Sequence, residues 1–126
     1  MVVVACCGFT LTIHAQTGVP VTAPPTFPAK AQAPTAAELS THLGGNVFKG
    51  KTAAGQGWRL DFRASGHVFA DTSTGARDSG TWRSEDSKVC LDYRGRFPSG
   101  CAEVRIAPQT IYYLRNTGEI VTLLAD

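Results

Sequence analysis

Residues 58–64 read WRLDFRA, and in this stretch Trp58, Leu60 and Phe62 alternate with charged side chains. A period of two residues places the apolar side chains on one face of a β-strand and the charged ones on the other. The alternation returns after short segments such as SG, STGAR, SED and NTG, whose composition is typical of tight turns. The pattern predicts eight strands, near residues 46–52, 57–64, 67–72, 78–84, 87–94, 101–107, 110–115 and 119–124.

Eight short strands joined by tight turns predict an all-β fold, an antiparallel meander. Such a sheet loses its exposed edges when it closes on itself, so we expect an up-and-down β-barrel, with a β-sandwich as the alternative. Large side chains would fill most of the interior and leave room for only a small ligand cavity. The residues assigned to this interior are Trp58, Phe62, Phe69, Trp82, Leu91 and Val104, of which Trp58, Phe62, Trp82 and Leu91 are the candidate core or ligand-lining residues.

One short helix is expected before the first strand, over residues 35–43 of PTAAELSTHLGG. Thr35 and Glu38 have the spacing of a capping box, and Gly44 follows as a stop signal. Leu39 and Leu43 lie four residues apart and share one helix face. A helix with a single apolar stripe has to cover something, and we expect it on an end or edge of the sheet.

Composition and the N-terminus indicate one exported domain. The 126 residues are 43% hydrophobic and 17% charged with a formal charge of +2, and no basic run suggests nucleic acid as a partner. Residues 1–15 read as a signal peptide cut after Ala15, with a lipoprotein signal at Cys6 as the alternative. Residues 16–33 hold four of the seven prolines and predict a disordered tether, which leaves 34–126 as the barrel domain. The mature chain has no apolar stretch long enough to span a membrane, and we expect it to be periplasmic or secreted.

Removal of the signal peptide leaves two cysteines, Cys90 and Cys101. In a hairpin both would lie on the polar face of adjacent strands, within reach of each other, so a disulfide is expected. Two alternatives are a zinc site with His42 and His67 and a redox-active dithiol, although the close Cys pairs typical of both are missing.

The run SGTWRSEDSKVCLDYRGRFPSGC, residues 79–101, resembles an uncharacterised family of small secreted or periplasmic proteobacterial β-domains. The resemblance covers roughly residues 45–107 and implies export, a β-meander and a hairpin disulfide, without any catalytic residue. The segment TAAELS, residues 35–40, is similar to that of serralysin-type metalloprotease inhibitors, which are small eight-stranded barrels with an N-terminal arm. The motif of the first family is carried by Gly80, Trp82, Cys90, Tyr93 and Cys101.

A phosphate-loop pattern, GNVFKGKT, occupies residues 45–52. Such loops join a strand to a following helix, whereas here a predicted helix precedes the pattern and a strand contains it. We therefore expect residues 46–52 to be a strand, with Gly50 allowing a bend or bulge and no helix starting at Lys51.

Candidate binding residues gather at one hairpin tip, where Tyr93, Arg94, Arg96 and Phe97 are positioned to grip a partner. We expect an exported non-enzymatic β-domain that binds a small ligand or a protein partner, with no cofactor and no metal. The first alternative is an inhibitor of a secreted or periplasmic hydrolase, such as a protease or a lysozyme. The second is a small hydrolase using Ser65, His67 and Asp71. Partner identity and oligomeric state are left open.

Overall fold

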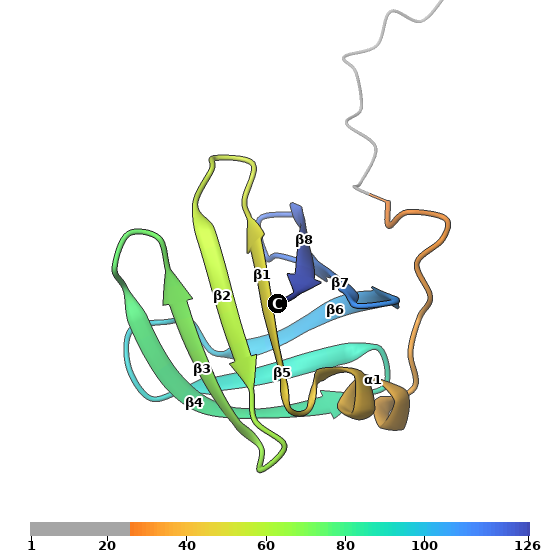
Figure 1. The fold of residues 1–126 in the computed structure, drawn as a ribbon, viewed down its shortest axis with the longest axis horizontal. Coiled ribbons are helices and arrows are strands. Elements are labelled where there is room, and N and C mark those ends of the chain that lie inside the picture. Colours follow the sequence, from red (N-terminus) through yellow and green to blue (C-terminus); the bar gives the residue numbers. More distant parts are fainter. Residues whose placement is uncertain (1–25) are drawn as a thin grey trace, which may run out of the picture.

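In the computed structural model, which describes residues 26–126, the alternating segments form one closed antiparallel barrel in chain order (Figure 1). The predicted meander is confirmed, and every strand lies within two residues of its expected bounds. The strands are β1 Asn46–Lys51, β2 Gly57–Phe62, β3 His67–Thr72, β4 Arg77–Glu85, β5 Lys88–Tyr93, β6 Gly100–Ala107, β7 Thr110–Leu114 and β8 Ile120–Ala125.

The core lies inside the barrel and holds one alternating face of each strand. Phe48 of β1 pairs in register with Leu60 of β2, and both are buried. On the other side of the barrel, β7 and β8 contribute Ile111 and Leu123, which also pair. Burying one face of every strand fixes the register, because a slip by one residue would turn that face to water.

The prediction for Phe69 is wrong. In β3 the residues that point inward are Val68 and Ala70, which are buried, so Phe69 points outward and is 44% exposed. The guanidinium of Arg63 lies over its ring at 5.4 Å from the centroid. Cross-strand register decides this orientation, because successive side chains of a strand face opposite sides of the sheet.

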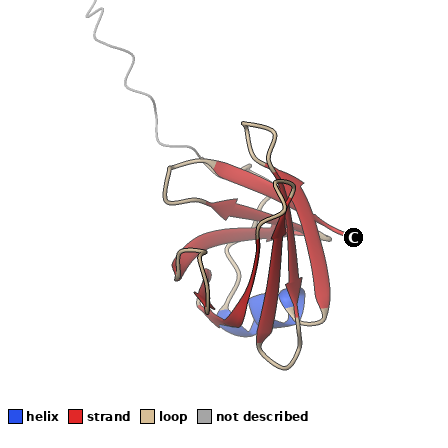
Figure 2. Ribbon diagram, turned by 90° about the vertical axis from the view of Figure 1, so that its left-hand side faces the viewer, coloured by secondary structure: helices blue, strands red, loops and turns tan. Residues whose placement is uncertain are grey.

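The helix α1, Ala36–Leu43, lies across one end of the barrel (Figure 2). As predicted, Thr35 caps it: its hydroxyl oxygen accepts the backbone N–H of Glu38 at 3.2 Å. Leu39 and Leu43 are completely buried and join the barrel core. Polar contacts fix the helix on the rim, since the Ser84 hydroxyl donates to the Ala36 carbonyl at 2.8 Å. The apolar stripe therefore closes this end of the barrel.

The last residues of the predicted tether contact the barrel. Gln32 exchanges two backbone hydrogen bonds with Ile106, each of 2.8 Å. The Arg105 guanidinium lies 4.6 Å from the ring centroid of Phe27. The contacts of the barrel domain therefore extend upstream of Pro34. The expected signal peptide, the lipidation alternative at Cys6 and the remainder of the tether lie outside the described residues.

The phosphate-loop pattern is strand β1, as expected, and the described chain has no helix starting at Lys51. Gly50 is regularly paired with Trp58 on one side and Leu123 on the other, so the bulge expected there is not formed. A Cβ on Gly50 would lie 2.3 Å from the Thr122 carbonyl oxygen. The glycine is needed because β1 and β8 approach closely where the barrel closes.

Within residues 26–126, no helix combines the length and apolar character needed to cross a bilayer.

Candidate functional site

One end of the barrel is covered by helix α1, and the other is formed by loops. Strand β1 leaves the helix end at Asn46, and because neighbouring strands are antiparallel, alternate loops gather at the opposite end. We call that end the open rim. It is formed by the loops 52–56, 73–76, 94–99 and 115–119.

A cavity of about 530 Å³ extends from the open rim into the barrel. It is larger than expected because small side chains face inward there: Ala70 and Thr72 from β3, and Ala102 from β6. The ladder between β6 and β7 also ends at the pair Val104 and Tyr113, so the first half of β6 is paired with β5 alone. The barrel is therefore solid at the helix end and hollow at the open rim.

Two pairs of aromatic rings line the cavity. Trp58 of β2 meets Tyr113 of β7 edge to face, with 5.8 Å between the ring centroids. Tyr93, at the end of β5, meets Phe97 of the next loop in the same way at 5.4 Å. Edge-to-face pairs hold each other's orientation, so these walls are formed before any ligand arrives.

Tyr93 and Tyr113 bring two hydroxyl groups to this aromatic lining. Burial raises the pKa of Tyr93, and its neighbour Tyr113 raises the pKa further. Burial likewise raises the pKa of Tyr113, partly offset by Arg115. Both hydroxyls therefore stay protonated at physiological pH. Neither forms a hydrogen bond with any residue between 26 and 126, and neither is sealed from solvent.

Arg115 stands at the mouth of the cavity. Its guanidinium lies 5.0 Å from the ring centroid of Trp58, and its Nη1 donates to Glu119 Oε2 at 2.7 Å. Glu119 also accepts the backbone N–H of Ala53 from the first rim loop. The carboxyl pKa of Glu119 is lowered by this backbone hydrogen bond first and by Arg115 second. One acidic residue thus fixes both a rim loop and the arginine.

The loop 94–99 is held in place by Asp78 from β4. Its carboxylate accepts the N–H of Gly95 at 3.0 Å and that of Phe97 at 2.9 Å. These bonds, the one from Phe97 foremost, lower the pKa of Asp78. The carboxylate therefore places the Phe97 ring against Tyr93.

In each of the two groups of predicted site residues, some members line the cavity and others do not. Of the candidate lining residues, Trp58 and Leu91 face the cavity. Phe62 and Trp82 instead pack edge to face at the helix end, with 5.5 Å between their ring centroids. The indole N–H of Trp82 donates to the Arg63 carbonyl at 2.9 Å.

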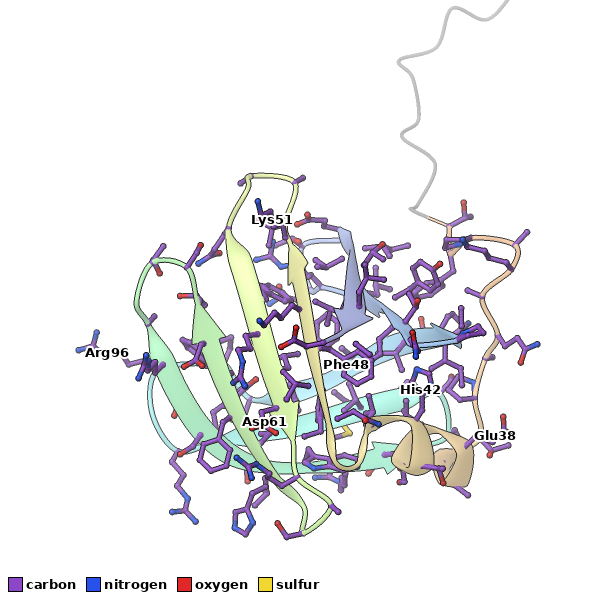
Figure 3. The ribbon with its side chains drawn as sticks, viewed as in Figure 1. Glu38, His42, Phe48, Lys51, Asp61 and Arg96 are labelled. Atoms are coloured by element: carbon purple, nitrogen blue, oxygen red, sulfur yellow. A yellow bond between two sulfur atoms is a disulfide. The ribbon has the colours of Figure 1, made fainter. Side chains whose placement is uncertain are left out.

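The predicted hairpin-tip group is divided as well. Tyr93 and Phe97 line the cavity, whereas Arg94 and Arg96 are exposed, with Arg96 extending away from the barrel (Figure 3). Sequence reasoning missed Asp78, Tyr113 and Arg115. For the last two a signal existed, since Ile111, Tyr113 and Arg115 alternate along one predicted strand.

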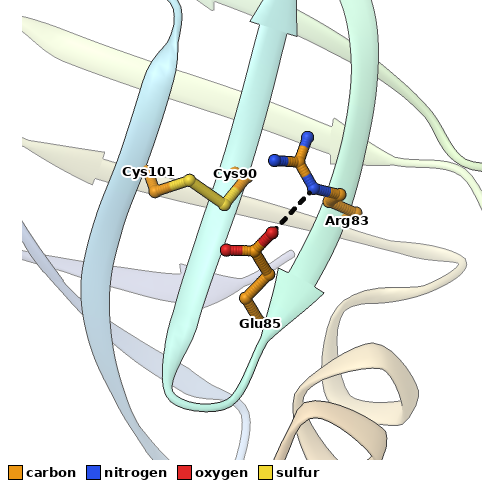
Figure 4. Close-up of a disulfide and its surroundings, with 4 residues drawn as sticks. All are labelled: Arg83, Glu85, Cys90 and Cys101. Atoms are coloured by element: carbon orange, nitrogen blue, oxygen red, sulfur yellow. Dashed lines mark hydrogen bonds and ion pairs between the residues drawn. A yellow bond between two sulfur atoms is a disulfide. The ribbon is translucent and has the colours of Figure 1, made fainter.

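Cys90 and Cys101 pair directly across β5 and β6 and form the expected disulfide (Figure 4). Beside it, Arg83 Nε donates to Glu85 Oε1 at 3.1 Å. Glu85 and the two cysteines are the only group in residues 26–126 whose ligand atoms are close enough for a metal, but the sulfurs are already bonded to each other. His42 donates to the Thr110 carbonyl instead of joining them.

The hydrolase alternative requires Ser65, His67 and Asp71 to meet. Ser65 Oγ lies 3.1 Å from His67 Nδ1, and both side chains are exposed. Asp71 lies four residues further along β3, roughly 13 Å away at the rise of an extended strand. There it pairs with Arg59 at 3.6 Å and Arg77 at 3.3 Å. The carboxylate is therefore not positioned to orient His67.

No family model matches this chain, and no curated protein matches it either. Of the features that the two resemblances imply, the structure shows the architecture: a small eight-stranded antiparallel barrel with one disulfide.

Proposed function

We propose that this protein is an exported, non-enzymatic binding domain that takes a small, largely apolar ligand into the open rim of its barrel. The observation that carries the proposal is the cavity of about 530 Å³ walled by Trp58, Tyr93, Phe97 and Tyr113. Its volume lies in the range of roughly 300–1,000 Å³ found for small-molecule sites. Its aromatic walls offer apolar area at a low cost in side-chain entropy.

Binding without chemistry fits the groups that face the cavity. The two tyrosines are kept neutral, and Arg115 is engaged by Glu119. Asp71, at the edge of the cavity, is engaged by Arg59. The two tyrosines, Arg115 and Asp71 offer neither a nucleophile with an adjacent base nor a pair of free carboxylates. Export is supported by the disulfide, since such bonds persist in oxidising compartments.

The test uses NMR with naphthoate as a small aromatic probe and the Trp58 indole N–H as the reporter. We expect saturable shifts of that resonance. Ala102→Phe fills the cavity from β6 and is expected to weaken binding at least about tenfold. Thr122→Phe adds the same side chain to an exposed position of β8 and is expected to leave the Kd unchanged. Equal affinities for the two variants, or the absence of saturable shifts in the parent protein, would refute the proposal.

A protein partner is the second candidate, and the 94–99 loop favours it. Asp78 orders this loop, while Arg94 and Arg96 form no ion pair with any residue in the described range. Two cations presented on an ordered loop suit an acidic surface, such as the cleft of an exported protease or lysozyme.

Enzyme inhibition by the purified protein, abolished in the double variant Arg94→Glu and Arg96→Glu, would support this second candidate. Lys88→Glu, on an exposed position of β5 away from the loop and without an ion pair in the described range, is the control for the change in charge. Unchanged enzyme activity on addition of the parent protein would refute inhibition of the enzyme tested.

A further inference from the structure

We propose that the cavity selects flat apolar molecules bearing a carbonyl or carboxylate oxygen, which accepts hydrogen bonds from the hydroxyls of Tyr93 and Tyr113. This rests on the proposed function and specifies its ligand.

The first step is the chemistry of the two hydroxyls. Tyr93 lies on β5 and Tyr113 on β7, and both line the same cavity. A phenol can donate one hydrogen bond and accept others. Neither hydroxyl has a partner among residues 26–126, and burial holds both in the protonated form. Two hydroxyl groups able to donate therefore belong to the lining of one largely apolar site.

The second step is the charge at the mouth. Arg115 uses Nη1 for Glu119 and leaves further N–H groups of its guanidinium without a partner in the described chain. The acidic residues that line the cavity do not offset the positive charge of Arg115 from inside the barrel. Asp71 is turned toward Arg59 and Arg77, and Glu103 alternates onto the outer face of β6 together with Cys101. The interior thus favours acceptors over cations.

The third step is the shape of the walls. The pairs Trp58 with Tyr113 and Tyr93 with Phe97 present ring faces and edges from three strands and one loop. A flat conjugated body placed between them would stack on apolar area. Its acceptor oxygen would then meet the hydroxyls, so that the body supplies affinity and the oxygen supplies selectivity.

Four probes with one ring system test this inference by calorimetry on the full chain: naphthoate, naphthamide, methylnaphthalene and naphthylmethylammonium. We expect naphthoate and naphthamide to bind about tenfold or more tightly than methylnaphthalene, and the ammonium probe to bind most weakly.

The variant Tyr93→Phe with Tyr113→Phe keeps both rings and removes both hydroxyls. It should bring the affinity for naphthamide to within about twofold of that for methylnaphthalene, while methylnaphthalene binding stays the same. Tyr112→Phe is the control, because Tyr112 is the neighbouring tyrosine of β7 whose side chain alternates to the other face.

The outcomes separate the two proposals. Binding of methylnaphthalene with the same affinity as naphthamide would overturn the acceptor inference and leave the proposed function standing. A preference for the ammonium probe, or retention of the naphthamide preference in the double Phe variant, would overturn the inference as well. Failure of all four probes to bind would refute the proposed function itself.

Discussion

Removal of the Cys90–Cys101 disulfide is expected to destabilise the barrel strongly. The bond joins residues 11 apart in the sequence, at the centre of a β5–β6 ladder of only four register pairs. The most direct perturbation is the double variant Cys90→Ala and Cys101→Ala, because single variants would leave a free thiol. Reduction of the parent protein provides an independent route to the same open state.

The magnitude follows from the length of the closed loop. For a loop of this length the chain-entropy model gives about 3 kcal/mol at 25 °C. In a domain of 60–100 residues, each 1 kcal/mol shifts the Tm by about 4–8 °C. The expected fall in Tm is therefore roughly 12–24 °C. The cavity wall should loosen too, since Gly100, the neighbour of Cys101, lines the cavity.

The assay is thermal unfolding followed by circular dichroism, with and without a thiol reductant. The parent protein should lose stability on reduction, and the double Ala variant should show the lower Tm under both conditions. That variant is the control for effects of the reductant on groups other than the disulfide. A reduced parent protein that unfolds within about 2 °C of the oxidised one would refute the chain-entropy argument for this loop.

Leu43→Ala removes part of the apolar stripe that closes the helix end and should lower the free energy of unfolding by about 2–5 kcal/mol in urea. Thr41→Ala, on the exposed side of the same helix, should change it little, and equal effects would contradict the closing role of α1. Asp78 has a lowered folded-state pKa, so its stabilisation of the 94–99 loop should be complete above the unfolded value of about 3.9 and lost as the pH falls through the folded value. NMR titration of the Gly95 amide checks this, with Asp78→Asn expected to abolish the transition; a midpoint at or above the ordinary Asp pKa would contradict it.

The strands were predictable because the signal that forms them is local. In WRLDFRA each residue faces the side opposite to its neighbours, and the pattern needs no knowledge of what lies across the sheet. The helix was predictable for the same reason, since Thr35, Glu38, Leu39 and Leu43 interact over three or four residues.

Phe69 shows where local reasoning fails. Its size suggested the core, but in HVFADT the inward positions belong to Val68 and Ala70. Hydrophobicity alone did not decide the orientation, because an aromatic ring can also be covered on the outside, here by Arg63. The hairpin-tip residues show the same limit, because local reasoning did not separate the two that line the cavity from the two exposed arginines. Tyr93 ends strand β5, whereas Phe97 is held by Asp78, which lies far away in sequence and accepts its N–H and that of Gly95.

By itself the sequence determined the meander, the capped helix and the pairing of Cys90 with Cys101, since alternation, capping and hairpin spacing act over a few residues. Only the tertiary structure decided which end of the barrel is hollow. The helix end is filled by Leu39 and Leu43, whereas the open rim is left hollow by small residues from separate strands. A cavity is the space that several strands leave between them, so it appears only once their registers are fixed together.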